Sequence, residues 1–304
     1  MIRIFKDEAR QQAFERDGFV KLELLRPEDM KELEDYYLSL TDGKVQNTVY
    51  GMWVSLHDEH ADIEAKRKTM EHIHRIVLPR LNEHFIDCKP HLGSYLVKVP
   101  NPKSFTFPHQ DWTFVDNEQL DYLCSLTIWI TLKDIDIPTG TLGFIKGSPK
   151  FFDNVIGSPS PAITTLTRGH EPLLFQYLTY PKVGAGDALA FNNKTIHAAL
   201  PNTGNYQRIA LGIGITPARA ELFHYYLKPG TTNRLLKLKV EEEFFVQYSN
   251  QALYELYMQG RLPGYSRVVG ELDYDFTAPT AEEIVALCLE HGGAHNGMTV
   301  DLRR

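Results

Sequence analysis

Short runs of alternating hydrophobic and polar positions fill the middle of the chain. Each run is separated from the next by Gly, Pro, Asn or Asp, which is typical of strands joined by turns. Many short strands in succession favour a sandwich or a barrel, so we expect a mainly β protein with flanking helices and a double-stranded β-helix core, a cupin-like jelly roll. The predicted strands are residues 94–99, 122–132, 141–145, 188–191 and 207–216.

Helical periodicity lies on both sides of this core. Residues 7–16 predict a short helix and residues 19–22 a strand, after which Pro27 opens a second helix. Thr280 has the side chain of an N-cap and precedes an apolar periodic run. The other predicted helices are residues 57–81, 235–252 and 281–291.

One domain accounts for all 304 residues in this interpretation. We divide it into an N-terminal elaboration of helices and strand (1–90), a jelly-roll core (91–217) and a C-terminal helical extension (218–304). A proline-containing stretch at about 147–186 is interpreted as a loop insertion across the mouth of the barrel. Loops in such positions commonly shape a substrate site.

The composition narrows the functional classes. Hydrophobic residues make up 43% of the chain and charged residues 23%, which is ordinary for a globular protein with a sizeable core. The formal charge of −7 and the pI near 5.9 argue against a nucleic-acid partner, which requires a basic surface. Since the sequence contains no run of about 18 apolar residues, we expect no membrane span.

The cysteines and the N-terminus suggest a compartment. Cys88, Cys124 and Cys288 are odd in number and widely separated, so we predict neither a disulfide framework nor a zinc cluster. The first eight residues include acids and lack an apolar h-region, which argues against a targeting segment. We therefore expect a cytoplasmic protein with a small-molecule partner, and the sequence leaves its oligomeric state open.

The segment around His109 and Asp111 carries the candidate chemistry. In an extended strand, residues two apart project from the same face, so these side chains can chelate one ion. A second histidine from a distant strand would complete two imidazoles and one carboxylate, a set that suits non-haem Fe(II) and leaves positions for substrate and oxygen. His197 is the candidate for that ligand. A His-x-Asp tripeptide also arises by chance, and taken alone it is a weak signal.

Three further residues are candidates for binding an anionic co-substrate. Arg208 opens a predicted strand eleven positions after His197, and a guanidinium can pair with a carboxylate through two hydrogen bonds. Trp129 can pack beside such a co-substrate, and Lys98 can provide a second cationic contact. The plainer alternatives are that Trp129 is a core residue and that Lys98 points to solvent.

Several aromatic and polar residues are weaker candidates. An apolar pocket wall or ordinary packing explains the aromatic ones equally simply. We interpret the histidine pairs at 57 and 60 and at 72 and 74 as solvated, because their spacing does not match a metal-binding pattern. Asn193, in the sequon Asn-Lys-Thr, is interpreted as part of a turn. The candidates for the substrate pocket are Tyr50, Trp53, Trp112, Phe114, Arg168 and His170.

The metal and anion candidates belong to a longer ordered series. The series comprises residues 14–20, His109-Gln110-Asp111, residues 129–132 and 139–148, Gly186-Asp187, His197, Asn202 and Arg208. In order and spacing it resembles the phytanoyl-CoA dioxygenase-like branch of the Fe(II)/2-oxoglutarate-dependent oxygenases. The resemblance covers about residues 10–217 and is far more specific than the tripeptide alone.

The resemblance implies a role for each matched residue. His109, Asp111 and His197 would bind Fe(II), 2-oxoglutarate would chelate that iron, and Arg208 would hold its C5 carboxylate. Trp129 matches a position that lines the co-substrate site, and Lys98 matches less closely. Some members place a hydroxyl residue two positions after the distal histidine, where this chain has Ala199. The second contact to the C5 carboxylate is therefore left open.

The resemblance also implies a reaction. O2 and 2-oxoglutarate would be consumed, succinate and CO2 released, and a C–H bond of a small metabolite or natural-product intermediate hydroxylated. Asp111 favours oxygen transfer, since related halogenases lack this carboxylate. Desaturation, epoxidation and ring formation stay open, because they depend on substrate placement. The alternative from another class is a catalytically silent jelly-roll module that binds a metal or ligand, whose signature would be a missing ligand or arginine.

Overall fold

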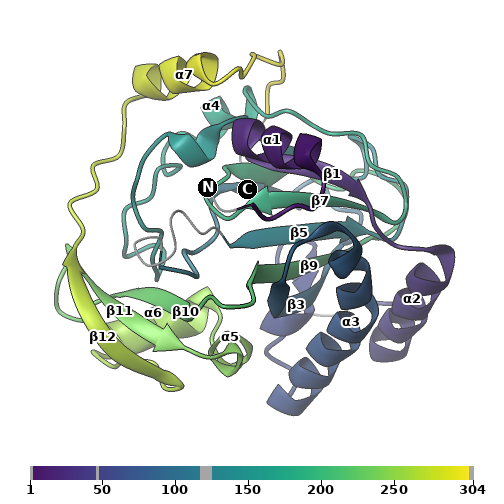
Figure 1. The fold of residues 1–304 in the computed structure, drawn as a ribbon, viewed down its shortest axis with the longest axis horizontal. Coiled ribbons are helices and arrows are strands. Elements are labelled where there is room, and N and C mark those ends of the chain that lie inside the picture. The colour runs from purple at the N-terminus through teal and green to yellow at the C-terminus, as the bar shows by residue number, and fades with distance from the viewer. Residues whose placement is uncertain (1–2, 46–47, 117–124, 301–304) are drawn as a thin grey trace.

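Two antiparallel sheets face each other at the centre of the computed structural model, which describes residues 3–45, 48–116 and 125–300 (Figure 1). The larger sheet has the order β1-β7-β5-β9-β3-β2 and the smaller one the order β4-β8-β6. This arrangement confirms the expected mainly β core. The strands are β1 (Phe19–Glu23), β2 (Met52–Val54), β3 (Cys88–Lys98), β4 (Thr106–His109), β5 (Leu126–Thr131), β6 (Leu142–Phe144), β7 (Asp187–Asn192), β8 (His197–Ala199) and β9 (Arg208–Pro217).

The five strands predicted from alternation correspond to β3, β5, β6, β7 and β9. Part of the run predicted at 122–132 lies outside the described residues, as does Cys124. The described cysteines, Cys88 and Cys288, are free. Among the described helices, none combines the length and the apolar character that crossing a lipid bilayer requires.

Helices cover the outer face of the larger sheet. The helix α1 (Glu8–Asp17) leads into β1, and α2 (Pro27–Thr41) and α3 (Ile63–His84) lie beside β3 and β9 (Figure 1). Leu33 of α2 and Ile73 of α3 are fully buried in one cluster with residues of the sheet. The Tyr95 hydroxyl of β3 donates to the Leu33 carbonyl at 2.7 Å, so the sheet and the helical layer are joined by a polar contact as well as by packing.

Successive side chains of β9 point alternately toward the helices and toward the interior between the sheets. Ile209, Leu211, Ile213 and Ile215 belong to the cluster under the helices. The intervening residues Ala210, Gly212 and Gly214 face the interior between the sheets, because successive side chains of a strand point to opposite faces. A Cβ on Gly212 would lie 2.9 Å from Leu96, and one on Gly214 would lie 2.6 Å from His91. The two glycines therefore let the Leu96 and His91 side chains pack directly against β9.

The C-terminal extension is not mainly helical, and the prediction for 218–304 is wrong in this respect. It contains a third sheet of β10 (Leu222–Leu227), β11 (Arg234–Val240) and β12 (Ser266–Asp273), together with α5 (Glu242–Gln247), α6 (Asn250–Met258) and α7 (Ala281–Glu290). The sheet and α5 and α6 lie below the core in Figure 1. The end of the chain agrees better with expectation, because Thr280 caps α7 and forms a capping box with Glu283.

The error at 235–240 has a physical cause. In β11, Leu236, Leu238 and Val240 are buried against Phe114 and alternate with Lys237 and Lys239. This is the period of a strand with one buried face, but Leu235 is buried as well and makes the run look like the start of an amphipathic helix. Pairing with β10 and β12 decides the outcome.

Truncation of Leu211 tests the packing of β9 against the helices. Leu211 is completely buried, so Leu211→Ala is expected to lower the free energy of unfolding by about 2–5 kcal/mol. Leu289, with 57% of its surface exposed, is the matched control, and Leu289→Ala is expected to change the stability by less than about 0.5 kcal/mol. Urea denaturation followed by circular dichroism measures both. Equal effects of the two substitutions would contradict the assignment of Leu211 to the core.

Candidate metal centre

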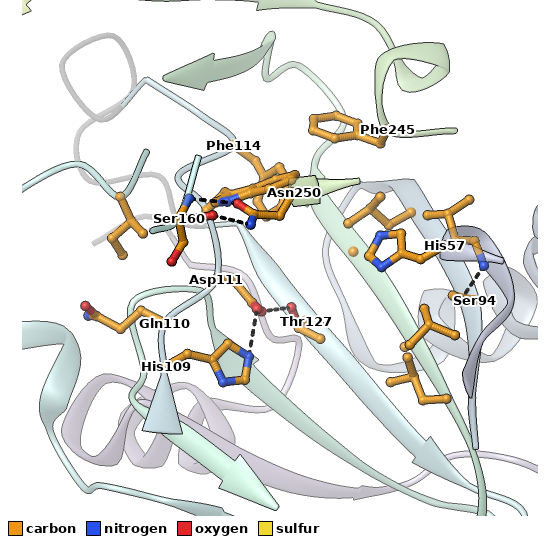
Figure 2. A pocket seen from close by; sticks show the side chains of 18 of the residues that line it. His57, Ser94, His109, Gln110, Asp111, Phe114, Thr127, Ser160, Phe245 and Asn250 are labelled. Atoms are coloured by element: carbon orange, nitrogen blue, oxygen red, sulfur yellow. Dashed lines mark hydrogen bonds and ion pairs between the residues drawn. The ribbon is translucent and has the colours of Figure 1, made fainter. Parts of the chain in front are cut away.

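The register of the smaller sheet brings the predicted ligands together. His109 at the end of β4 lies directly opposite His197 at the start of β8, and their ring centroids are 4.1 Å apart. Asp111 follows two residues after His109, and its Oδ1 lies 3.9 Å from Nε2 of His109 and 3.8 Å from Nε2 of His197. One ligand atom of each residue thus lies within 4.8 Å of the others. Figure 2 shows His109 and Asp111 side by side at the cavity wall.

Each imidazole has its second nitrogen fixed by the backbone. Nδ1 of His109 lies 2.8 Å from the Phe107 carbonyl, and Nδ1 of His197 lies 2.9 Å from the Thr195 carbonyl. A carbonyl oxygen only accepts hydrogen bonds, so each Nδ1 carries the proton and each Nε2 presents its lone pair. Such a bond also fixes the orientation of a metal-binding ring. Both rings are therefore prepared as neutral nitrogen ligands.

Two residues that the sequence did not indicate hold the carboxylate. The Thr127 hydroxyl donates to Oδ2 of Asp111 at 2.6 Å, and the Asn193 amide donates to the same oxygen at 3.3 Å. The Asp111 backbone N–H donates to the Asn193 carbonyl at 2.9 Å. Asn193 is thus more than the turn residue we predicted. Thr127 shares the interior face of β5 with Trp129, and this alternation is the sequence signal that could have revealed it.

Burial favours the neutral state of the ligand from β8. It lowers the pKa of His197 to about 4, and the positive charge that His109 would carry lowers it further in the same direction. The Asp111 carboxylate opposes this shift but is the smaller influence. At neutral pH a cation therefore does not compete with a proton for Nε2 of His197.

The three co-substrate candidates also gather at one place. Arg208 and Lys98 are paired across β9 and β3, and both are buried. The guanidinium carbon of Arg208 lies 5.4 Å from the centroid of the Trp129 ring. Trp129 belongs to the interior cluster between the sheets, so it is a core residue and a neighbour of the arginine at once.

Both cations are buried without an ionic partner among the described residues. One terminal nitrogen of Arg208 donates to the Gly140 carbonyl at 2.8 Å, whereas its Nε has no partner in the described part of the chain. Nζ of Lys98 donates to the carbonyls of Ala199 at 3.2 Å and Leu200 at 2.7 Å, so the solvent-facing alternative is wrong. Burial, and then the charge of Arg208, hold the pKa of Lys98 well below its ordinary value. An anionic ligand would relieve this burial of positive charge.

A cavity of about 530 Å³ adjoins the ligand set, which is within the range of small-molecule sites. Trp112 and Phe114 line it as expected, and Arg168 lies at its wall. Tyr50 is 49% exposed and Trp53 is buried in the outer core, and neither is among the lining residues. Other parts of the wall come from Val54, Leu56, His57, Leu92, Ser94, Leu96, Gly212, Gly214, Ile156, Ser160, Phe245, Tyr248 and Asn250.

The remaining histidines correct another prediction. His60 is exposed as expected, but His57 lines the cavity. His72 stacks on Tyr36 with ring centroids 3.8 Å apart, and Nε2 of His74 lies 2.8 Å from the Leu92 carbonyl. The interpretation of His72 and His74 as solvated residues is wrong, because tertiary packing gives each ring a partner that the spacing did not indicate, whereas His57 is exposed as expected but faces the cavity. His170 does not line the cavity, and its ring bonds the Pro279 carbonyl at 2.9 Å.

Comparisons with known proteins agree with this geometry. The model of the phytanoyl-CoA dioxygenase (PhyH) family matches residues 14–210, more than half of the chain. A comparison with curated protein sequences found no match.

Several solved structures are similar to this chain at low sequence identity. The α-ketoglutarate-dependent carbocyclase SnoK from nogalamycin biosynthesis is 19% identical over 71% of this chain and 86% of its own, with a TM-score of 0.50. EvdO2 from Micromonospora carbonacea var. aurantiaca, complexed with 2-oxoglutarate, is 16% identical over 70% of this chain and 91% of its own, with a TM-score of 0.46. HygX from Streptomyces hygroscopicus, with nickel and 2-oxoglutarate bound, is 14% identical over 70% and 88%, with a TM-score of 0.47.

Removal of the Thr127 hydroxyl tests how Asp111 is held. Thr127→Val keeps the shape of the side chain and is expected to weaken Fe(II) binding about 10- to 100-fold, because Oδ2 of the carboxylate loses its closest donor. Anaerobic equilibrium dialysis of Fe(II) measures the affinity. Thr131→Val is the matched control, because Thr131 is also buried on β5 but bonds the Lys133 carbonyl. Equal affinities of the two variants would contradict the positioning role of Thr127.

Proposed function

Because this chain belongs to the phytanoyl-CoA dioxygenase family, a family of non-haem iron and 2-oxoglutarate-dependent oxygenases, we propose that it hydroxylates an unactivated C–H bond of a small molecule. The substrate is a metabolite or natural-product intermediate small enough to enter the cavity beside Asp111. In the reaction, substrate, 2-oxoglutarate and O2 give hydroxylated product, succinate and CO2.

One observation carries the proposal. His109, Asp111 and His197 offer two neutral nitrogens and one carboxylate oxygen at a single point. This donor set suits Fe(II) and covers one face of an octahedron, so the opposite face is free for 2-oxoglutarate and O2. The complete set, together with Arg208, argues against the catalytically silent module, whose signature would be a missing ligand or arginine.

The buried cations support the binding of a dicarboxylate. We assign the C5 carboxylate of 2-oxoglutarate to Arg208, whose unpartnered Nε is a donor that requires an acceptor. Lys98 would provide the second contact. Ala199 has no hydroxyl to assist Arg208, but its carbonyl accepts from Lys98 and so holds that ammonium near the arginine. Trp129 would pack beside the carbon chain.

The cavity supports a role of the chain in directing the oxidation. Iron with 2-oxoglutarate and O2 supplies an oxidant able to take hydrogen from an aliphatic C–H bond. The protein's own part is to exclude water and to hold one C–H bond of the substrate near Asp111. Trp112 and Phe114 follow directly after the ligands in sequence and line the cavity, so they are suited to orient the substrate.

The iron and 2-oxoglutarate assignment is tested without a substrate. Addition of Fe(II) and 2-oxoglutarate under nitrogen is expected to produce a visible metal-to-ligand charge-transfer band, and O2 is then expected to yield slow succinate formation. Asp111→Ala should abolish both. Asp153→Ala, at a side chain that is 89% exposed, should leave both unchanged. A folded wild-type protein that gives no band would contradict the oxygenase proposal, and a band without succinate would favour the binding module.

Substitution of Lys98 separates binding of the co-substrate from folding. Lys98→Met is expected to weaken 2-oxoglutarate binding roughly 10- to 100-fold, because one charged hydrogen bond is lost. The ligand-free variant is expected to be at least as stable as the wild type, since an unpaired buried charge has been removed. Lys103→Met, at an exposed position, is the control. Calorimetric titration with 2-oxoglutarate and thermal unfolding give the two readouts.

The pH dependence of the ligand-free protein follows from the same residue. The pKa of Lys98 is depressed on folding, so the unfolded chain binds this proton more firmly. The wild type is therefore expected to gain stability relative to Lys98→Met as pH rises from the depressed value toward lysine's ordinary value of 10.5. A stability difference that does not change with pH would contradict the assignment of an uncompensated ammonium.

A further inference from the structure

His57 projects into the cavity from a segment that is rigidly attached to β3. It ends the short helix η1 (Ser55–His57), which follows β2. The Ser55 hydroxyl accepts from the Tyr95 backbone N–H at 3.0 Å, and the Leu56 N–H donates to the Ser94 hydroxyl at 3.2 Å. Figure 2 shows the His57 ring directed into the cavity, across from Asp111. The backbone that carries His57 is therefore held in place before any substrate binds.

The ring has hydrogen-bonding capacity that the protein does not use. His57 forms no hydrogen bond with any residue in the described ranges, and its accessible surface belongs to the cavity lining. His57 is exposed toward the open cavity, and desolvation by its neighbours, followed by the charge of Lys66, lowers its pKa to about 4, so the imidazole is neutral at pH 7. A neutral imidazole offers one donor and one acceptor nitrogen.

Several other polar groups at the wall, among them Asn250, Ser94 and Gln110, already have hydrogen-bond partners, whereas the side chains of Thr165, Thr167 and Glu171 line it without one among the described residues. The Asn250 side chain accepts from the Ser160 backbone N–H at 2.9 Å and donates to the Ser160 carbonyl at 2.7 Å. The Ser94 hydroxyl donates to the Tyr95 carbonyl, and the Gln110 amide donates to the Lys194 carbonyl. His57 is thus a polar group of the wall that is free to bind a ligand.

The rest of the wall favours an uncharged ligand with a flat or bulky apolar body. Aromatic and aliphatic side chains form much of it, and three of them are Trp112, Phe114 and Phe245. Apart from the metal-site residues, the charged residues of the described lining are Arg168 and Glu171, one of each sign, and Arg168 is exposed and donates to the Ile163 carbonyl at 2.9 Å. An acyl-CoA carries phosphates that usually meet clustered arginines and lysines. The described wall has no such cluster.

We infer that His57 binds a hydroxyl group on an uncharged, ring-bearing substrate that packs between the apolar walls of this cavity. The inference rests on the proposed function for its meaning, since the cavity leads to the metal ligands. His57 would thus determine specificity for substrates that carry such a hydroxyl group. His57 would affect the binding of the substrate and is not one of the candidate iron ligands.

The test compares probes that differ in one group. 2-Naphthol and naphthalene share the apolar body, and 2-naphthoate adds a charge. Equilibrium dialysis against the full-length protein, with Fe(II) and 2-oxoglutarate under nitrogen, measures the three affinities. The wild type is expected to bind 2-naphthol about 5- to 10-fold more tightly than naphthalene, the value of one neutral hydrogen bond. His57→Phe keeps the ring and is expected to remove this preference while naphthalene still binds.

Controls separate the possible results. His60→Phe, at an exposed histidine of the same segment, should retain the preference. The inference is overturned if His57→Phe keeps the preference, if 2-naphthoate binds more tightly than 2-naphthol, or if neither neutral probe binds. A preference that persists when the charge-transfer band is absent would contradict the iron and 2-oxoglutarate assignment and leave the inference on His57 standing.

Discussion

The pairing of β4 with β8 places His109 opposite His197, and the rest of the site is built around that register. Side chains alternate along a strand, so a slip of one residue would turn one imidazole to the other face of the sheet. Packing opposes such a slip. The rings of Phe191 and Phe144 lie 4.5 and 6.4 Å from the ring of His197, and β6 pairs with the far side of β8. Apolar side chains thus determine where the polar ligands meet.

The positive charge buried between the two sheets is a second constraint on this structure. Lys98 and Arg208 are neighbours in register, both out of water, and neither has a carboxylate partner among the described residues. Such an arrangement is unfavourable unless a negative ligand completes it. An anionic ligand at this place would therefore offset the burial of both cations.

How far the sequence predicted this protein depended on the range of the interactions involved. The ligands and Arg208 were accessible because alternation and spacing are local signals, and the strands of the core followed from the same period. The third sheet was missed because the pattern of residues 235–240 is ambiguous until β10 and β12 pair with it. Thr127 and His57 were missed for another reason. Their roles come from contacts with segments far away in the chain; alternation places Thr127 on the interior face of β5, but only the fold brings Asp111 to it.

The third sheet has a consequence for how this protein can diverge. The region matched by the family model ends at residue 210, whereas Phe245, Tyr248 and Asn250 of the cavity wall come later in the chain. Ser158 joins the two regions, because its backbone N–H donates to the Tyr225 carbonyl and its carbonyl accepts from the Leu227 N–H. The candidate metal ligands and one part of the cavity wall are therefore encoded in separate regions of the chain. Substitutions of Phe245, Tyr248 or Asn250 can therefore reshape that part of the wall without changing any of the three candidate metal ligands.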